Sequence, residues 1–369
     1  MFDIAIIGAG MAGASLAAEL APHASVVVLE AEPQPGYHAT GRSAAFWEEC
    51  YGGPDIVPLT LASGAYLREH GMLSRRGALY IARAGAEAQA EAFLERFRAS
   101  RVTIEWLGRA ALERRLPGLR EGWTIGLSQP SCADIDVARL HHHYLALARR
   151  AGAEVRTGAR LVAAEREGPA WRLAMADGSE ARAGVLVDAA GAWADQIAAA
   201  AGAGPLGITP LRRTVAQIRT DPAPAADLPL VLDLMGEFYF KPEQGRLWLS
   251  PHDETPSAAC DAAPEDLDVA TAIDRFEQVL DWRIAAVERK WAGLRSFAPD
   301  RRPVYGFDPQ REGFFWFAGQ GGYGIQTAPA AARLGAQLLL GLPRDAMTEP
   351  LDEALYSPAR ASLGTGRSG

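Results

Sequence analysis

Two glycine-rich turns at opposite ends of the chain have the residue types that cradle a phosphate. Gly8–Gly13 follows the apolar run Ile4–Ile7, and Gly319–Gly324 follows Phe314–Phe317. Each turn lies between a strand-like and a helix-like run, so backbone amides can approach a ligand without side-chain obstruction. Two such turns on one mixed α/β chain predict a bound dinucleotide.

The first turn has the surroundings of a dinucleotide-binding βαβ unit. Residues 3–7 predict a buried strand, residues 11–21 a helix and Ser25–Leu29 a second strand. Glu30 then follows, 22 residues after Gly8, where a carboxylate can accept hydrogen bonds from ribose hydroxyls.

A second copy of the glycine pattern shows how little the bare spacing means. Gly202–Gly207 also fits it, but no strand precedes this segment, it follows a predicted helix, and it contains Pro205. We interpret it as a helix stop and linker.

Composition excludes several classes of protein. The 369 residues are 49% hydrophobic with a net charge of −8, which argues against disorder and against a nucleic-acid partner. Three scattered cysteines form no CxxC pair, which argues against a redox disulfide and a zinc ribbon. Neither a signal peptide nor a transmembrane stretch is visible. We expect a soluble cytoplasmic enzyme.

The remaining elements predict two interleaved domains. Short strand-like runs after Pro205 suggest a separate antiparallel sheet, and the chain returns to the glycine-rich type near its end. A short helix is expected near Ser43–Glu49. Longer helices are expected over 58–70, 86–100, Val137–Ala151, Pro264–Leu280 and Ile325–Leu340.

Four residues have the chemistry to bind a substrate carboxylate: Tyr51, Arg213, Tyr239 and Arg295. Arginine presents a planar fork to a carboxylate, and phenol hydroxyls add further donors. Arg295 is the strongest candidate because its neighbours are apolar, and a buried arginine requires an anion. The run His141–His143 lacks the spacing of metal ligands on one helix face, so we expect structural or surface histidines and no metal site.

Taken together, these segments resemble the flavin-dependent D-amino acid oxidase (DAO) superfamily, most closely its D-amino acid dehydrogenases of the D-arginine dehydrogenase type. The resemblance covers nearly the whole chain. It rests on Gly8–Gly13 with Glu30, Pro35–Ala45, Ala133–Asp136, Ala189–Trp193, Arg212-Arg213, Phe238-Tyr239, Trp291–Phe297, Gln320–Thr327 and Leu355–Pro358.

The resemblance implies an α/β fold with a glutathione-reductase-type FAD-binding Rossmann domain, interleaved with an α+β substrate domain built on an antiparallel sheet. The FAD-binding domain would comprise residues 1–46, 136–205 and 303–347. The substrate domain would comprise 47–135 and 206–302, and 348–369 would form a C-terminal tail, frayed from Ser362.

The cofactor implied by the resemblance is FAD, held without a covalent bond, because no cysteine lies in the second glycine-rich turn. The implied FAD contacts are Gly8, Gly10, Ala12, Gly13, Glu30, Arg42, Ser43, Ala44, Val162, Ala190, Gly191, Trp193, Gly322, Tyr323, Gly324, Ile325, Gln326 and Thr327. The helix that follows the second turn would point its N-terminus at the flavin.

The implied reaction is the oxidative deamination of a D-amino acid. Arg213 and Arg295 would clamp the carboxylate with help from Tyr51 and Tyr239, and Gln326 would help to hold the amine. Hydride would pass from Cα to flavin N5, and the imine would hydrolyse to a 2-oxo acid and ammonia.

Two departures put a preference for cationic side chains in doubt. Phe46 stands where the arginine-oxidising relatives place a histidine, and Gly77 where they place a carboxylate. Glu48 or Glu49 could supply a replacement charge. Alternatively, a more apolar side-chain pocket would be formed by Phe46, Trp47, Leu230 and Leu232.

Other functions remain open at this point. A glycine or sarcosine oxidase, or a 2-hydroxy acid dehydrogenase, would use the same carboxylate clamp. A flavoprotein that binds a small molecule without turnover is a further alternative. The electron acceptor is not identified by the sequence, and we expect a small amino acid as the substrate.

Overall fold

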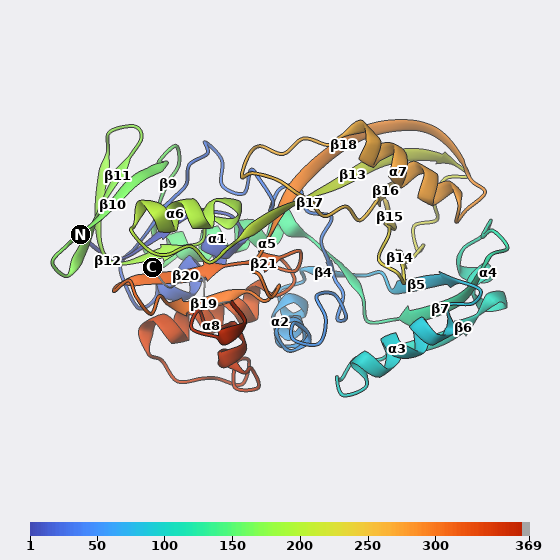
Figure 1. Ribbon diagram of the computed structural model, residues 1–369, viewed down its shortest axis with the longest axis horizontal. Coiled ribbons are helices and arrows are strands. Elements are labelled where there is room, and N and C mark those ends of the chain that lie inside the picture. Colours follow the sequence, from blue (N-terminus) through green and yellow to red (C-terminus); the bar gives the residue numbers. More distant parts are fainter. Residues whose placement is uncertain (364–369) are drawn as a thin grey trace.

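The computed structural model describes residues 1–363 and has two lobes, each built on a large sheet (Figure 1). Eight strands form the sheet of the first lobe and ten form that of the second. The expected frayed tail lies, from residue 364 on, outside the described residues.

The sheet of the first lobe is the predicted nucleotide-binding sheet. At its centre β1 pairs in parallel with β2 and β12, and β12 pairs in parallel with β20. The strands are β1 (Phe2–Ile7), β2 (Val26–Leu29), β9 (Glu154–Arg156), β10 (Leu161–Glu167), β11 (Ala170–Met175), β12 (Glu180–Asp188), β19 (Val304–Phe307) and β20 (Phe314–Ala318).

Helices cover both faces of this sheet, which explains why β1 is apolar throughout. Ile4 and Ile6 point to one core, whereas Ala5 and Ile7 point to the other. The first core also contains residues of α1 (Met11–Leu20), α5 (Val137–Arg150) and α8 (Ala328–Leu340), and the second contains residues of α6 (Ala194–Ala200). The expected Rossmann arrangement is confirmed.

The second lobe contains the expected sheet, which is antiparallel except for the parallel pair β5 and β14 and is extended by two long strands. β13 (Thr209–Asp221) and β18 (Arg283–Phe297) pair along their whole length and arch over this lobe (Figure 1). The other strands are β5 (Ala78–Arg83), β6 (Glu105–Gly108), β7 (Trp123–Gln129), β14 (Leu230–Asp233), β15 (Tyr239–Glu243), β16 (Arg246–Ser250), β17 (Thr255–Pro256) and β21 (Gln320–Gly321).

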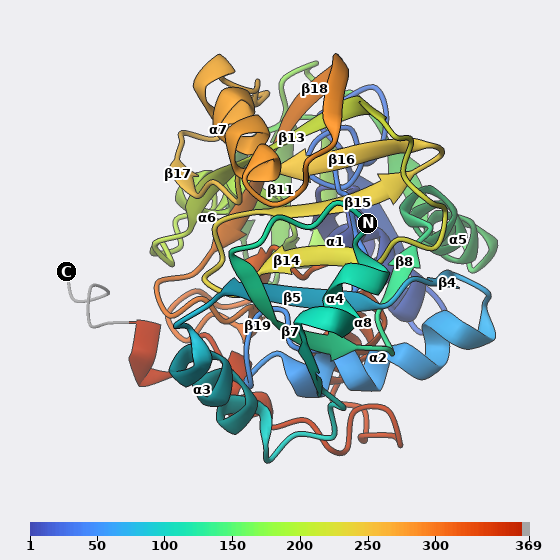
Figure 2. The ribbon, with the colours of Figure 1, turned by 90° about the vertical axis from the view of Figure 1, so that its right-hand side faces the viewer.

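Helices cover both faces of this sheet: α4 (Arg109–Arg115) and α7 (Asp266–Glu277) share a core on one face, and α3 (Glu87–Phe97) packs on the other. In Figure 2, which looks at the second lobe end-on, α3 and α4 lie near β7. Helix α7 packs on β13 and β16. The sequence analysis had assigned no element between residues 101 and 129, where β6, α4 and β7 lie.

A small third sheet joins the lobes and corrects one expectation. The short helix expected near Ser43–Glu49 is wrong, because β3 (Phe46–Trp47) pairs with β8 (Ala133–Ile135), which also pairs with β4 (Leu73–Arg75). Long-range pairing of this kind overrides local helix preference. The remaining helices are α2 (Val57–Glu69), η1 (Gly191–Trp193), η2 (Glu353–Tyr356) and η3 (Ala361–Leu363).

The strands of the first sheet all fall inside the segments expected for the FAD-binding domain, whereas β21 of the second sheet comes from the last of those segments. The domain boundaries themselves stay a prediction. Over residues 1–363, no helix combines the length and the apolar character needed to cross a membrane.

Candidate functional site

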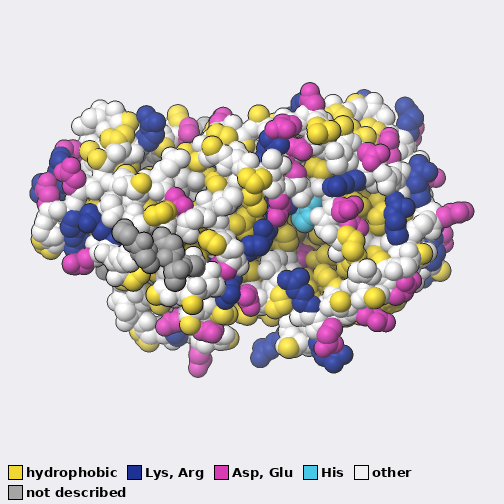
Figure 3. All heavy atoms as spheres, in the orientation of Figure 1, with side chains coloured by type: hydrophobic (Ala, Val, Ile, Leu, Met, Phe, Trp, Pro, Cys, Tyr) yellow, Lys and Arg dark blue, Asp and Glu magenta, His cyan; other side chains and the backbone are white. Residues whose placement is uncertain are grey.

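One cavity of about 650 Å³ connects the two glycine-rich turns. It begins beside Gly8 and Glu30, passes Arg42–Phe46, and ends in the second lobe at Arg213, Tyr239 and Arg295. Figure 3 shows a hollow between the lobes in which hydrophobic side chains gather and basic side chains lie close by.

The nucleotide end of the cavity requires glycine on steric grounds. A Cβ at Gly13 would lie 1.9 Å from the carbonyl oxygen of Gly8, and one at Gly8 would lie 2.7 Å from that of Ala189. Gly8 also has a φ of 101°, which L side chains rarely adopt. Helix α1 begins after Gly10, which has no side chain to cap it. The Met11 N–H donates to the Thr40 hydroxyl at 2.9 Å, and the helix N-terminus beyond it is suited to a phosphate.

Glu30 occupies the place expected of a ribose-binding acid. It follows β2, lines the cavity, and accepts hydrogen bonds from the backbone N–H groups of Ala9 at 2.6 Å and Glu32 at 2.9 Å. These bonds fix the carboxylate beside the phosphate turn, while each oxygen keeps a further lone pair for a ligand.

Most of the expected FAD contacts line this cavity. Gly13, Tyr323 and Thr327 do not: Gly13 packs α1 against its own turn, and the side chains of Tyr323 and Thr327 are buried. The lining residues among those expected are Gly8, Gly10, Ala12, Glu30, Arg42, Ser43, Ala44, Val162, Ala190, Gly191, Trp193, Gly322, Gly324, Ile325 and Gln326. Their individual contacts with FAD stay predictions.

The four candidate carboxylate ligands meet at the other end of the cavity. Arg295 donates to the Tyr51 hydroxyl at 3.0 Å, and all four side chains belong to residues of the lining. Arg213 lies on β13 and Arg295 on β18, and these two long strands pair with each other. Gly322 closes this end, where a Cβ would lie 2.2 Å from the Tyr51 hydroxyl.

The electrostatics of this end favour an anion. Burial and the charge of Arg295 lower the pKa of Arg213 to about 10, so Arg213 remains protonated at neutral pH. Burial would raise the pKa of Tyr51, but Arg295 and Arg213 together hold it below its ordinary value. Among residues 1–363, the acids in the lining are Glu30 and Glu32, and both belong to the nucleotide end.

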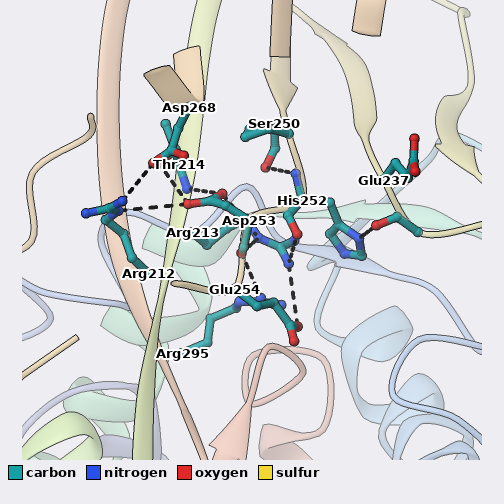
Figure 4. A network of polar contacts seen from close by, with 12 residues as sticks. Arg212, Arg213, Thr214, Glu237, Ser250, His252, Asp253, Glu254, Asp268 and Arg295 are labelled. Carbon is teal, nitrogen blue, oxygen red and sulfur yellow. Dashed lines mark hydrogen bonds and ion pairs between the residues drawn. The ribbon is translucent and has the colours of Figure 1, made fainter. Parts of the chain in front are cut away.

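The loop after β16 supports both arginines and was missed by the sequence analysis (Figure 4). Arg213 donates to the carbonyl oxygens of Asp253 at 2.9 Å and His252 at 3.3 Å. Arg295 donates to Glu254 at 2.9 Å, and its buried Nε has no hydrogen-bond partner within residues 1–363. The sequence does contain a run of titratable residues directly after a strand, which could have indicated a functional loop. Nothing in that run, however, shows that the loop faces Arg213.

Gln326 is placed differently from what its expected role requires. Its side-chain nitrogen donates to the Glu48 carbonyl oxygen at 3.1 Å and to the Thr60 hydroxyl at 2.8 Å, while its oxygen accepts from the Glu48 N–H. Both donors are used inside the protein, so the contact with the amine stays a prediction that these bonds do not favour.

The two proposed replacement charges lie behind the cavity wall. Glu48 is fully buried, which raises its pKa to about 7, and Glu49 accepts from Gln129 and Ser131. Neither residue lines the cavity. At Gly77 a Cβ would meet nothing within 4 Å.

Of the four residues expected to form an apolar pocket, two lie in the wall. Phe46 and Leu232 line the cavity, whereas Trp47 and Leu230 are buried outside it. The aromatic rings of Phe46 and Tyr239 are 5.9 Å apart and meet edge to face. The wall beside the clamp is therefore partly apolar and carries no acidic side chain.

The histidine run has structural contacts. His141 is buried, and its Nε2 lies 2.8 Å from the Ala9 carbonyl oxygen. His143 lies 2.8 Å from the Tyr66 hydroxyl. In the part of the chain that the structure describes, no three His, Cys, Asp or Glu side chains cluster as metal ligands would.

Known proteins resemble this chain in sequence. The chain is 27% identical over 372 residues to the bifunctional protein ThiO/ThiG of Synechocystis sp., which covers 97% of this chain and 54% of that protein. It is 30% identical over 188 residues to glycine oxidase of Pseudomonas aeruginosa, which covers 49% of this chain and 47% of that enzyme. Matches span from 34% to 54% of these and other curated relatives.

The fold is shared with solved structures. Glycine oxidase from Geobacillus kaustophilus superimposes with a TM-score of 0.83 at 24% identity, covering 97% of this chain and 98% of that one. A family model described as FAD dependent oxidoreductase (DAO) matches residues 3–338. The glycines, the N-terminus of α1 and Glu30 fit FAD at one end of the cavity. The chain thus belongs to the DAO family of FAD-dependent oxidoreductases, with FAD as its cofactor.

Proposed function

We propose that this protein oxidises a small amine that carries a carboxylate on the reacting carbon, with a glycine- or sarcosine-type amino acid as the substrate. One observation carries the proposal: Arg213 and Arg295 face the far end of the cavity, where no acid belongs to the lining. Bound FAD supplies the acceptor for the two electrons that leave the amine carbon.

The chain's own residues would orient the substrate and set its protonation state. Two guanidinium groups and two phenols fix a carboxylate at several points, which leaves the reacting carbon little freedom. The same positive charges disfavour an ammonium, so the amine is held neutral, the form that can lose hydride. A general base among the side chains is therefore not required.

The comparisons favour this substrate class over the D-arginine dehydrogenase type that the sequence motifs suggested. Glycine oxidase activity is named for the relative from P. aeruginosa and for the solved structure from G. kaustophilus. A D-amino acid with an uncharged side chain is the second candidate. The wall formed by Phe46 and Leu232 favours it, because that wall could cover a side chain.

An anaerobic titration of the purified flavoprotein tests the proposal. Glycine, sarcosine, matched D- and L-amino acids and 2-hydroxy acids are added in turn, and the flavin absorbance band is followed. Bleaching by glycine or sarcosine supports the proposal, and bleaching by D-amino acids alone supports the second candidate. If only 2-hydroxy acids bleach the band, or no compound does, amine oxidation is excluded.

A further inference from the structure

His252 is the one histidine in the wall of the substrate end of the cavity, and its ring is held by the protein on one side only. Its Nδ1 contacts the Gly236 carbonyl oxygen (Figure 4). Because a carbonyl can only accept, Nδ1 carries the hydrogen and Nε2 keeps a lone pair. Within residues 1–363 no hydrogen bond to this Nε2 is found.

The backbone of His252 is held in an unusual conformation. Its φ is 56°, in the left-handed region that residues other than glycine seldom adopt. The backbone N–H donates to the Ser250 hydroxyl at 3.1 Å, and the carbonyl accepts from Arg213 at 3.3 Å. Outliers of this kind cluster at functional sites, where surrounding contacts hold them in place. One residue thus supports the clamp through its backbone and also belongs to the cavity lining.

The ring remains neutral at working pH. Burial and then the charge of Arg213 lower the pKa of His252 to about 3. Nε2 is therefore a hydrogen-bond acceptor and not a donor. The ring of Tyr239 meets it edge to face, with centroids 6.0 Å apart.

Other residues of the cavity wall limit which substrate group could donate a hydrogen bond to His252. Phe46 and Leu232, which line the same cavity, offer no polar side-chain atoms. A cation would be repelled by Arg213 and Arg295, and Glu254, which pairs with both, offsets only part of that repulsion. An anionic group would meet the lone pair of Nε2 instead of a hydrogen. An uncharged hydrogen-bond donor on the substrate, a hydroxyl or a carboxamide, is compatible with all of these residues.

We propose that His252 is a specificity-determining residue that accepts a hydrogen bond from a hydroxyl or carboxamide on the substrate's side chain. The proposal rests on the proposed function, since it takes the carboxylate to be bound by Arg213 and Arg295. It applies to the second candidate within that function, an amino acid with a side chain, because glycine and sarcosine carry no side chain on the reacting carbon. It also excludes the cationic side chains of arginine and lysine as preferred substrates.

Two pairs of substrates of matched size test the proposal. Serine is compared with 2-aminobutyrate, and asparagine with leucine, each as the enantiomer that the enzyme turns over. The wild-type protein should prefer serine and asparagine in kcat/KM. The variant His252→Ala should lose about tenfold in kcat/KM for these two, the effect of one hydrogen bond, and change little for the other two. Substitution to Asn should restore part of the preference, since its amide oxygen can accept.

Met235→Ala is the matched control. Met235 adjoins Gly236 on the same hairpin, but its side chain is 50% exposed and lies outside the cavity, so all four values should stay unchanged. An equal loss for all four substrates in His252→Ala would overturn the proposal in favour of a structural role. Equal kcat/KM values for the two substrates of each pair in the wild-type enzyme would also overturn the proposal. A flavin that no amino acid reduces would overturn the proposed function and this proposal with it, whereas turnover with unchanged ratios overturns this proposal alone.

Discussion

The two ends of the cavity are built from different materials. The nucleotide end is built largely of backbone, glycines and two acids, Glu30 and Glu32, close to the N-terminus or in short turns after strands. The substrate end consists of long side chains from β13, β18 and the loop after β16, which the fold brings together. Backbone-built sites therefore leave a local pattern in the sequence, whereas side-chain-built sites depend on tertiary packing.

The largest expected effect breaks the nucleotide end. Gly13→Ala places a Cβ 1.9 Å from the Gly8 carbonyl oxygen, and backbone must move to relieve the clash. We expect the purified variant to retain far-UV circular dichroism but to bind less than about a tenth of the wild-type flavin, as strained sites typically lose 1–3 kcal/mol or more. The flavin-to-protein absorbance ratio measures this.

Its control is the second glycine pattern. A Cβ at Gly204 meets nothing within 4 Å, so Gly204→Ala should leave flavin content unchanged. Equal flavin content in both variants would show that the steric argument for the first turn is wrong.

The second largest expected effect is a loss of activity at the substrate end of the cavity, without an effect on flavin binding at the nucleotide end. Arg295→Ala removes one of two cationic partners of the carboxylate, so kcat/KM should fall by about a thousandfold, roughly 4 kcal/mol, with flavin content unchanged. Arg283→Ala is the control, because Arg283 lies on the same strand, its side chain is 71% exposed, and it lies outside the lining. A loss of flavin together with activity would mean that the two ends are not separable.

The third effect concerns the buried acid behind the substrate end. Burial raises the pKa of Glu48 from 4.5 to about 7, so the folded state binds more protons than the unfolded state between these values. Stability should therefore fall as pH rises from about 4.5 to 7 and level off above. Glu48→Gln should show a smaller decline, measured as melting temperature against pH. If melting temperature declined equally with pH in the wild-type protein and in Glu48→Gln, the raised pKa would not belong to Glu48.

The smallest expected effect concerns the electrostatics of the substrate end. Glu254 accepts from Arg295 at 2.9 Å, and its carboxylate offsets part of the charge that the substrate meets. Glu254→Gln should lower KM by about threefold at low salt, because a side chain 35% exposed is well screened. The difference should vanish at high salt. A raised KM would instead assign Glu254 to holding Arg295 in place.

The same comparison explains what the sequence could predict. The βαβ unit around Gly8 and Glu30 was predictable because its strand, turn and acid follow one another along the chain. Arg213 and Arg295 were found as candidates from residue type, apolar neighbours and family resemblance. His252 was not found, because its orientation depends on a positive φ and on a carbonyl from a neighbouring hairpin. The strand at Phe46 was mistaken for a helix because its partner, β8, lies far along the chain.

The measurement that tests the central claim most directly compares an amino acid with the amine that lacks its carboxylate. Sarcosine and dimethylamine, and alanine and ethylamine, are mixed anaerobically with the flavoprotein, and the rate of flavin bleaching is recorded. If Arg213 and Arg295 clamp a carboxylate, at least one amino acid should reduce the flavin about a thousandfold faster than its amine. Equal rates inside both pairs would contradict the clamp.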